Sequence, residues 1–183
     1  MTSMVLEQLH RDHRNMRELL AVVEKELGGH AEGRAPDYEL LRDVLDYLLN
    51  YPDLVHHPKE DLIYKRILAR DSTAGDEIGD LIADHATLAG KTRALAAALR
   101  FVGADGEVPR DWIEKIARDY FEALRGHMEH EETGVFQMAL RKLDDEDWLA
   151  IDLASSKPES LLVGRQSEER YLALHDRIMR LAA

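Results

Sequence analysis

The chain has 183 residues, which is enough for one domain with a hydrophobic core. It contains no cysteine, which excludes disulfides, thiolate zinc sites and Cys-ligated iron–sulfur clusters. Any bound metal must therefore have nitrogen and oxygen ligands. The formal net charge is -12, from 36 acidic and 24 basic residues, which argues against a nucleic-acid-binding surface and against docking to an anionic membrane.

The first residues show no basic segment followed by an apolar stretch, so we expect no signal peptide. No apolar run approaches the roughly 20 residues that a membrane-spanning helix needs. These features predict a soluble, cytoplasmic protein.

The hydrophobic pattern predicts helices throughout, because apolar residues recur at spacings of three and four. Gly28 and Gly29 are expected to end the first helix, Ser72 or Thr73 to cap the third, and Pro109 to lie in the first turn of the fourth. The four long helices are expected at roughly 2–28, 37–70, 76–102 and 108–142. With short connections, they predict an all-α, up-down-up-down four-helix bundle.

A C-terminal extension follows the bundle, so we divide the chain into residues 1–143 and 144–183. Residues 144–148 predict a short helix, and a last helix is expected at roughly 165–181. Tyr171, Leu174, Ile178 and Leu181 share one face of that helix. We expect this face to pack on the bundle or on a second subunit, which would make a homodimer.

The second long helix contains two prolines, Pro52 and Pro58. A proline inside a helix removes one backbone hydrogen bond and bends the axis, and the alternative is a break near Tyr51. Either disturbance falls beside His56, and local irregularity is common where ligands must be oriented.

Each long helix carries one histidine on its apolar stripe, and two of these histidines have a glutamate four residues later, on the same face. The histidines also lie at one level of the bundle to within about one turn. His57 and Glu132 are expected to point away from the core. The resulting candidate metal ligands are His13, His56, Glu60, His85, His127 and Glu131. Imidazoles and carboxylates that converge from several helices favour a transition metal, and we expect iron.

A purely structural polar core is the alternative, since a single histidine on an apolar face is more often a hydrogen-bonded core residue than a ligand. Buried carboxylates, however, are costly unless they are paired or bind a metal. We expect His30 and His175 to be exposed to solvent. The tyrosines are expected to be core and rim residues rather than redox participants, with an outer-sphere role open to the last of them: Tyr47, Tyr51, Tyr64 and Tyr120.

Over about residues 5–142, the chain resembles the hemerythrin-like family of HHE cation-binding domains. The resemblance lies in Asp12-His13, in the stretch from His56 to Glu60 (His-His-Pro-Lys-Glu), in Asp84-His85, and in the stretch from His127 to Glu132. It implies a non-haem di-iron site in a four-helix bundle, with Glu60 and Glu131 as bridging carboxylates and the histidines as terminal ligands.

One position departs from the family. Oxygen-carrying hemerythrins have a second histidine one turn after the third-helix histidine, and here that position is Ala89. His10, His57, His130 or a water molecule could fill the gap, and His130 is the best of these candidates. An open coordination position favours binding or reduction of oxygen, peroxide or nitric oxide.

Four functions are compatible with these patterns, and whether the protein is an enzyme stays open. The first is a di-iron protein that binds or processes a small oxidant for sensing, storage or detoxification. The second is an iron-dependent regulatory or storage module without turnover. A ferritin-like oxidase is disfavoured because that class uses two Glu-x-x-His motifs, and only Glu7 to His10 fits. The fourth is a metal-free helical interaction protein.

Overall fold

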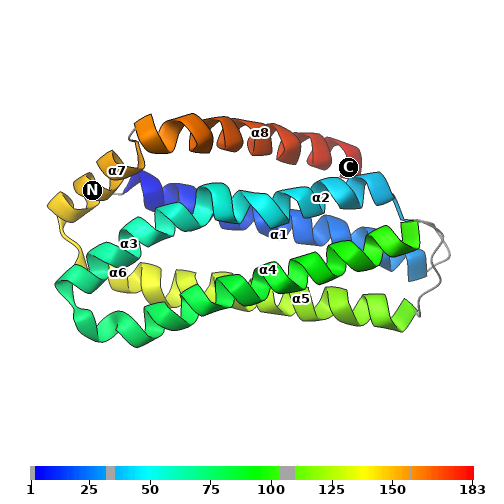
Figure 1. Ribbon diagram of the computed structural model, residues 1–183, viewed down its shortest axis with the longest axis horizontal. Coiled ribbons are helices and arrows are strands. Elements are labelled where there is room, and N and C mark those ends of the chain that lie inside the picture. The colour runs from blue at the N-terminus through cyan, green and yellow to red at the C-terminus, as the bar shows by residue number, and fades with distance from the viewer. Residues whose placement is uncertain (1–2, 32–35, 104–109, 157) are drawn as a thin grey trace.

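The computed structural model describes residues 3–31, 36–103, 110–156 and 158–183, and within these ranges it contains helices and turns but no strand. Four helical rods run alternately up and down (Figure 1), which confirms the predicted all-α bundle. The rods are formed by α1 (Met4–Ala31), by α2 (Tyr38–Tyr51), η1 (Pro52–His56) and α3 (His57–Arg70), by α4 (Gly75–Gly103), and by α5 (Arg110–His130), η3 (Glu131–Val135) and α6 (Phe136–Lys142).

Two predicted helix ends are wrong. The first helix continues through Gly28 to Ala31, because Gly28 keeps an ordinary helical backbone rather than the left-handed conformation that ends helices. A short 3-10 turn, η2 (Ser72–Ala74), precedes α4, and its cap is Asp71 rather than Ser72 or Thr73: Asp71 Oδ1 accepts the backbone N–H of Thr73 at 2.9 Å. Pro109 lies outside the described residues.

The prolines widen the second rod without breaking it. In η1 the N–H of His57 donates to the carbonyl of Pro52, five residues earlier, which is the bonding pattern of a π-helical turn. A second such turn lies in η3, where the N–H of Phe136 donates to the carbonyl of Glu131. Both wide turns therefore contain a candidate ligand, a placement that is frequent at functional sites.

The core has two hydrophobic parts, one on each side of the candidate ligands. One part contains residues such as Met16, Leu88 and Met128, and the other contains Leu9, Ile63 and Val135 among others. Along each rod the candidate ligands come between members of the two parts. The sequence therefore places a polar layer across the middle of the bundle, closed by apolar packing above and below.

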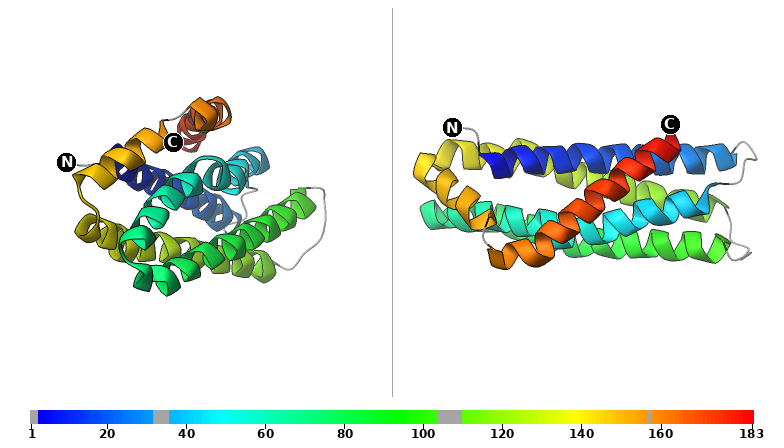
Figure 2. Two further views of the ribbon diagram at one scale, coloured as in Figure 1. Left: turned by 60° about the vertical axis from the view of Figure 1, so that its left-hand side comes forward. Right: turned by 90° about the horizontal axis from the view of Figure 1, so that it is seen from above.

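The C-terminal helices pack on the outside of the bundle. The helix α7 (Asp145–Ser155) is longer than predicted; it contacts α1 and α3, and Asp144 and Asp147 form a capping box at its start. The helix α8 (Pro158–Ala182) crosses α1 and α2 obliquely (Figure 2). Its Tyr171 and Ile178 are buried as the shared face predicts, but Leu181 is 61% exposed because it lies in the last turn.

None of the described helices is long and apolar enough to span a membrane.

Candidate metal centre

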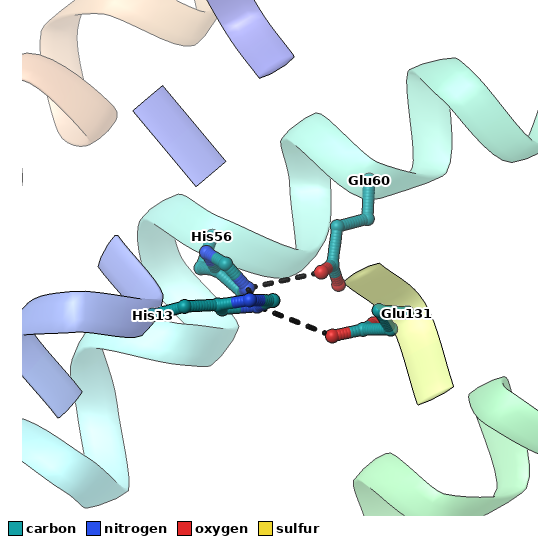
Figure 3. A group of neighbouring side chains, drawn as sticks. All are labelled: His13, His56, Glu60 and Glu131. Atoms are coloured by element: carbon teal, nitrogen blue, oxygen red, sulfur yellow. Dashed lines mark hydrogen bonds and ion pairs between the residues drawn. The ribbon is translucent and has the colours of Figure 1, made fainter. Parts of the chain in front are cut away.

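Four candidate ligands from three rods turn toward one point (Figure 3). Nε2 of His56 lies 2.9 Å from Oε1 of Glu60, and Nε2 of His13 lies 3.2 Å from Oε2 of Glu131. The two imidazole nitrogens are 3.1 Å apart. All four side chains are buried, and one ligand atom from each lies within 4.8 Å of the others. We call this group, His13, His56, Glu60 and Glu131, site 1.

A second group lies directly beside site 1. Nε2 of His85 is 3.6 Å from Oε2 of Glu60, and Nε2 of His127 is 3.3 Å from Oε1 of Glu131. We call the position faced by His85 and His127, together with these two carboxylates, site 2. Each glutamate directs one oxygen at each site, which is the arrangement of a carboxylate that bridges two metal ions. The structure thus brings together all six residues that the sequence singles out.

Glu132 lies behind His13 and orients its ring. Nδ1 of His13 is 2.9 Å from Oε1 of Glu132, and Arg17 holds the same carboxylate through two N–H groups at 3.0 and 2.8 Å. Since an ionised carboxylate only accepts hydrogen bonds, Nδ1 must carry the proton, and Nε2 keeps its lone pair for site 1. Glu132 points away from the centre, as expected, but it acts on a residue that faces the centre.

Asp12 lies behind His56 and orients its ring, as Glu132 does for His13. Nδ1 of His56 is 3.1 Å from Oδ2 of Asp12, and the hydroxyl of Tyr51 donates to Oδ1 of Asp12 at 2.7 Å. On the other side of the centre, the hydroxyl of Tyr64 donates to Oε1 of Glu131 at 2.8 Å. The tyrosines are buried core residues, as predicted, and these two also hold the acidic groups of the centre in place.

His57 lies in the centre, and the prediction that it points away is wrong. Its ring stacks on that of His85 with centroids 3.7 Å apart and planes 10° apart. One ligand atom each from His57, Glu60 and His85 lies within 4.8 Å of the others. The physical reason is the wide turn of η1: it holds more residues per turn, so adjacent residues are separated by a smaller rotation, and both His56 and His57 reach inward.

The other histidines lie outside the centre, and two expectations about them need correction. The ring of His130, the favoured candidate for the missing ligand, is 45% exposed and faces Glu77 of α4 at 3.9 Å. His175 was expected to be exposed, but it lies on the buried side of α8, with Nε2 3.1 Å from Glu18 of α1. His10 is partly exposed and packs edge-on against Phe136. The side chain of His30 lies outside the described residues.

The donor set fits a cation. The Nδ1–H groups of His13 and His56 donate outward, to Glu132 and Asp12, so their Nε2 atoms face each other and the carboxylates. Within the described residues, both oxygens of Glu60 and Oε2 of Glu131 meet no hydrogen-bond donor outside the candidate ligands, and Nε2 of His85 has no hydrogen-bond partner. Buried acceptors with so few donors cost free energy, and a metal ion between them would satisfy all of them at once.

The charges of the centre lead to the same conclusion. Burial and the neighbouring Glu131 raise the pKa of Glu60. Burial lowers the pKa of His56, but Glu60 and Asp12 outweigh it and raise that pKa to about 10. In the metal-free protein His56 therefore carries a second proton, on Nε2 beside Glu60, and a metal ion would replace this proton as the positive charge of the centre.

Residues 4–139 match the Hemerythrin HHE cation binding domain, which covers more than half of the chain. The chain belongs to the hemerythrin HHE cation-binding family. No curated protein and no solved structure matches it. The match runs from the first residue of α1 into α6, so the hemerythrin domain contains both sites, whereas α7 and α8 lie beyond it.

The hemerythrin bundle leaves a small cavity beside the histidines of both sites. Its volume is ≈ 30 Å³, and His13, His56, His57, His85 and His127 contribute to its wall. The rest of the wall is mostly apolar and includes Met16, Leu88, Ala89, Leu124 and Met128. A water molecule needs roughly 10–15 Å³ of such volume, so the cavity has room for a molecule of two or three heavy atoms.

Several residues of the centre were missed by the sequence patterns. Asp12 was noted only as part of the family motif, and Arg17, Asp53 and Tyr51 were given no role toward the ligands. The sequence does contain part of this information, because Asp12 directly precedes a candidate ligand and Asp53 lies four residues before His57. Helical spacing alone does not show which acidic side chain lies behind which imidazole, because the two come from different helices in most of these pairs.

Proposed function

We propose that this hemerythrin-family chain holds two iron ions, one at each site, and that the centre binds or processes a small oxidant. His13 and His56 are the terminal ligands of site 1, and His85 and His127 those of site 2. Glu60 and Glu131 bridge the two sites. The observation that carries the proposal is the pair of shared, buried carboxylates, each with one oxygen toward each site.

Iron is the metal that this donor set favours. Cysteine is absent, so soft thiolate ligands are excluded. Imidazole nitrogens together with carboxylates suit iron among the transition metals, and iron would supply the electrons for chemistry with oxygen, peroxide or nitric oxide. The chain's own residues hold the ligands in orientation from behind and close the centre off from bulk water.

The cavity supports a small oxidant as the second component. It adjoins the histidines of both sites, its volume of ≈ 30 Å³ matches a diatomic molecule or a peroxide, and it is too small for a larger organic substrate. Leu88, Leu124 and Met128 give it an apolar wall that favours uncharged molecules.

The experiment is anaerobic reconstitution of the purified chain with ferrous iron, followed by separate additions of oxygen, hydrogen peroxide and nitric oxide in a stopped-flow spectrometer. We expect about two irons per chain and a rapid spectral change with at least one of the three. Leu124→Phe, which fills the cavity, should slow this change without lowering the iron content. Protein that takes up iron but reacts with none of the three would overturn the oxidant proposal and favour iron storage or regulation. Protein without iron would overturn both parts.

A further inference from the structure

In the oxygen-carrying pattern, the helix that holds the counterpart of His85 supplies a second imidazole one turn later. Position 89, one turn after His85, is an alanine, and its small side chain lines the cavity. His127 and His85 alone would leave site 2 short of one terminal ligand compared with the oxygen-carrying pattern.

His57 and Ala89 line the same cavity, and the ring of His57 stacks on His85 at 3.7 Å between centroids. The side chain of His57 is only 19% exposed. Its ligand atom lies within 4.8 Å of those of Glu60 and His85, so one ion can contact all three.

An acidic side chain also lies behind the ring of His57. Nδ1 lies 3.0 Å from Oδ1 of Asp53, one turn earlier on the same rod. The carboxylate fixes the proton on Nδ1 and leaves the Nε2 lone pair free. Glu132 does the same for His13, and Asp12 for His56. An acidic partner behind a metal-ligating imidazole is the usual support of such a ligand.

We propose that His57 is a ligand of site 2, oriented by Asp53, and that it supplies the imidazole that the alanine at position 89 does not. This proposal rests on the two-metal centre proposed above. Site 2 then has three imidazoles, from the η1–α3 junction, α4 and α5, in addition to the two shared carboxylates. Asp53 is a positioning residue, since it acts on the metal only through His57.

The test is a metal titration of the intact, metal-free chain with cobalt(II) under anaerobic conditions. Cobalt absorption reports the ligands of each ion without any need for catalytic activity. The wild-type chain should bind two ions. His57→Ala should keep one ion and weaken the other by about 10–100-fold. Because the side chain of Asp53 is 61% exposed, Asp53→Asn should weaken the same ion by no more than about fivefold. His130→Ala is the matched control, because this exposed histidine should leave both ions unchanged.

A double variant decides whether His57 replaces the missing ligand. His57→Ala combined with Ala89→His restores an imidazole from the family position, and it should restore the second ion. Circular dichroism of the metal-free variants checks that each is folded, and His57→Gln serves if the alanine variant is not. The proposal would be overturned if His57→Ala protein bound two ions with wild-type affinity. It would also be overturned if the double variant still bound the second ion as weakly as His57→Ala does. A wild-type chain that binds two ions but does not react with oxidants leaves this inference standing and removes only the oxidant proposal.

Discussion

Asp12 should matter more to metal binding than any other carboxylate that lies behind a ligand. It is 1% exposed, receives the hydroxyl of Tyr51 at 2.7 Å, and faces Nδ1 of His56 at 3.1 Å. Hydrogen bonds to a buried charged group contribute about 1.5–3 kcal/mol, and 1.4 kcal/mol corresponds to a tenfold change in affinity. Asp12→Asn should therefore weaken metal binding at site 1 by roughly 10- to 150-fold.

Asp84 is the matched comparison, because it stands in the same relation to His127. Its side chain is 52% exposed and its carboxylate is 3.8 Å from Nδ1, beyond hydrogen-bond distance. Exposed pairs of this kind contribute about 0.2–1 kcal/mol, so Asp84→Asn should weaken binding by no more than about fivefold. Tyr51→Phe keeps the Asp12 carboxylate but removes one donor, and its effect should lie between the two.

The assay is competition for zinc or ferrous iron against a chromophoric chelator, with the unfolding of the metal-free proteins measured in parallel. The parallel measurement separates a loss of affinity from a loss of fold. Equal losses for Asp12→Asn and Asp84→Asn would refute the reasoning, because burial and distance would then not determine how strongly a carboxylate supports its imidazole.

Four further variants test the shared carboxylate of Glu60 and the packing of the C-terminal helices. Glu60→Gln should weaken the binding of both ions in the cobalt(II) titration. Selective loss of one ion would contradict a bridging role. Asp147→Asn weakens the pairing of buried Asp147 with Arg66 and should lower the free energy of unfolding by about 1–3 kcal/mol in urea titrations. Tyr171→Ala should cost about 3–5 kcal/mol in the same measurement, whereas Leu181→Ala, at an exposed position, should stay within about 0.5 kcal/mol.

The bundle and the six candidate ligands could be predicted because both depend on one regular property, the helical repeat. Residues such as His13 and His85 lie on apolar stripes of unbroken α-helices, where a rotation of 100° per residue holds over the whole length. Spacing of four residues also places Glu60 beneath His56, and Glu131 beneath His127, whatever the neighbouring helices do. These predictions needed no knowledge of tertiary contacts.

The predictions that failed depend on tertiary contacts or on departures from the α-helical repeat. His175 was expected to be exposed to solvent, but α8 crosses α1 and α2 at an angle that buries it against Glu18. His130 lies near the apolar stripe of its own helix, yet it faces Glu77 at the surface. His57 was misplaced because the sequence showed the prolines but not the wide turn that accompanies them.

The wide turns show why this layer of the bundle departs from ideal geometry. Pro52 and Pro58 lack N–H groups, so the rod already forgoes two α-helical hydrogen bonds around η1, and a π-helical turn costs less there than in an uninterrupted helix. The turn η3 contains Gly134, where a Cβ atom would lie 2.9 Å from Oε1 of Glu77 and 3.2 Å from the ring of His130. A side chain at position 134 would therefore displace the carboxylate of Glu77 from its place beside His130. Two rods widen at the level where they supply ligands, and in η1 the widening lets adjacent histidines face two adjacent sites.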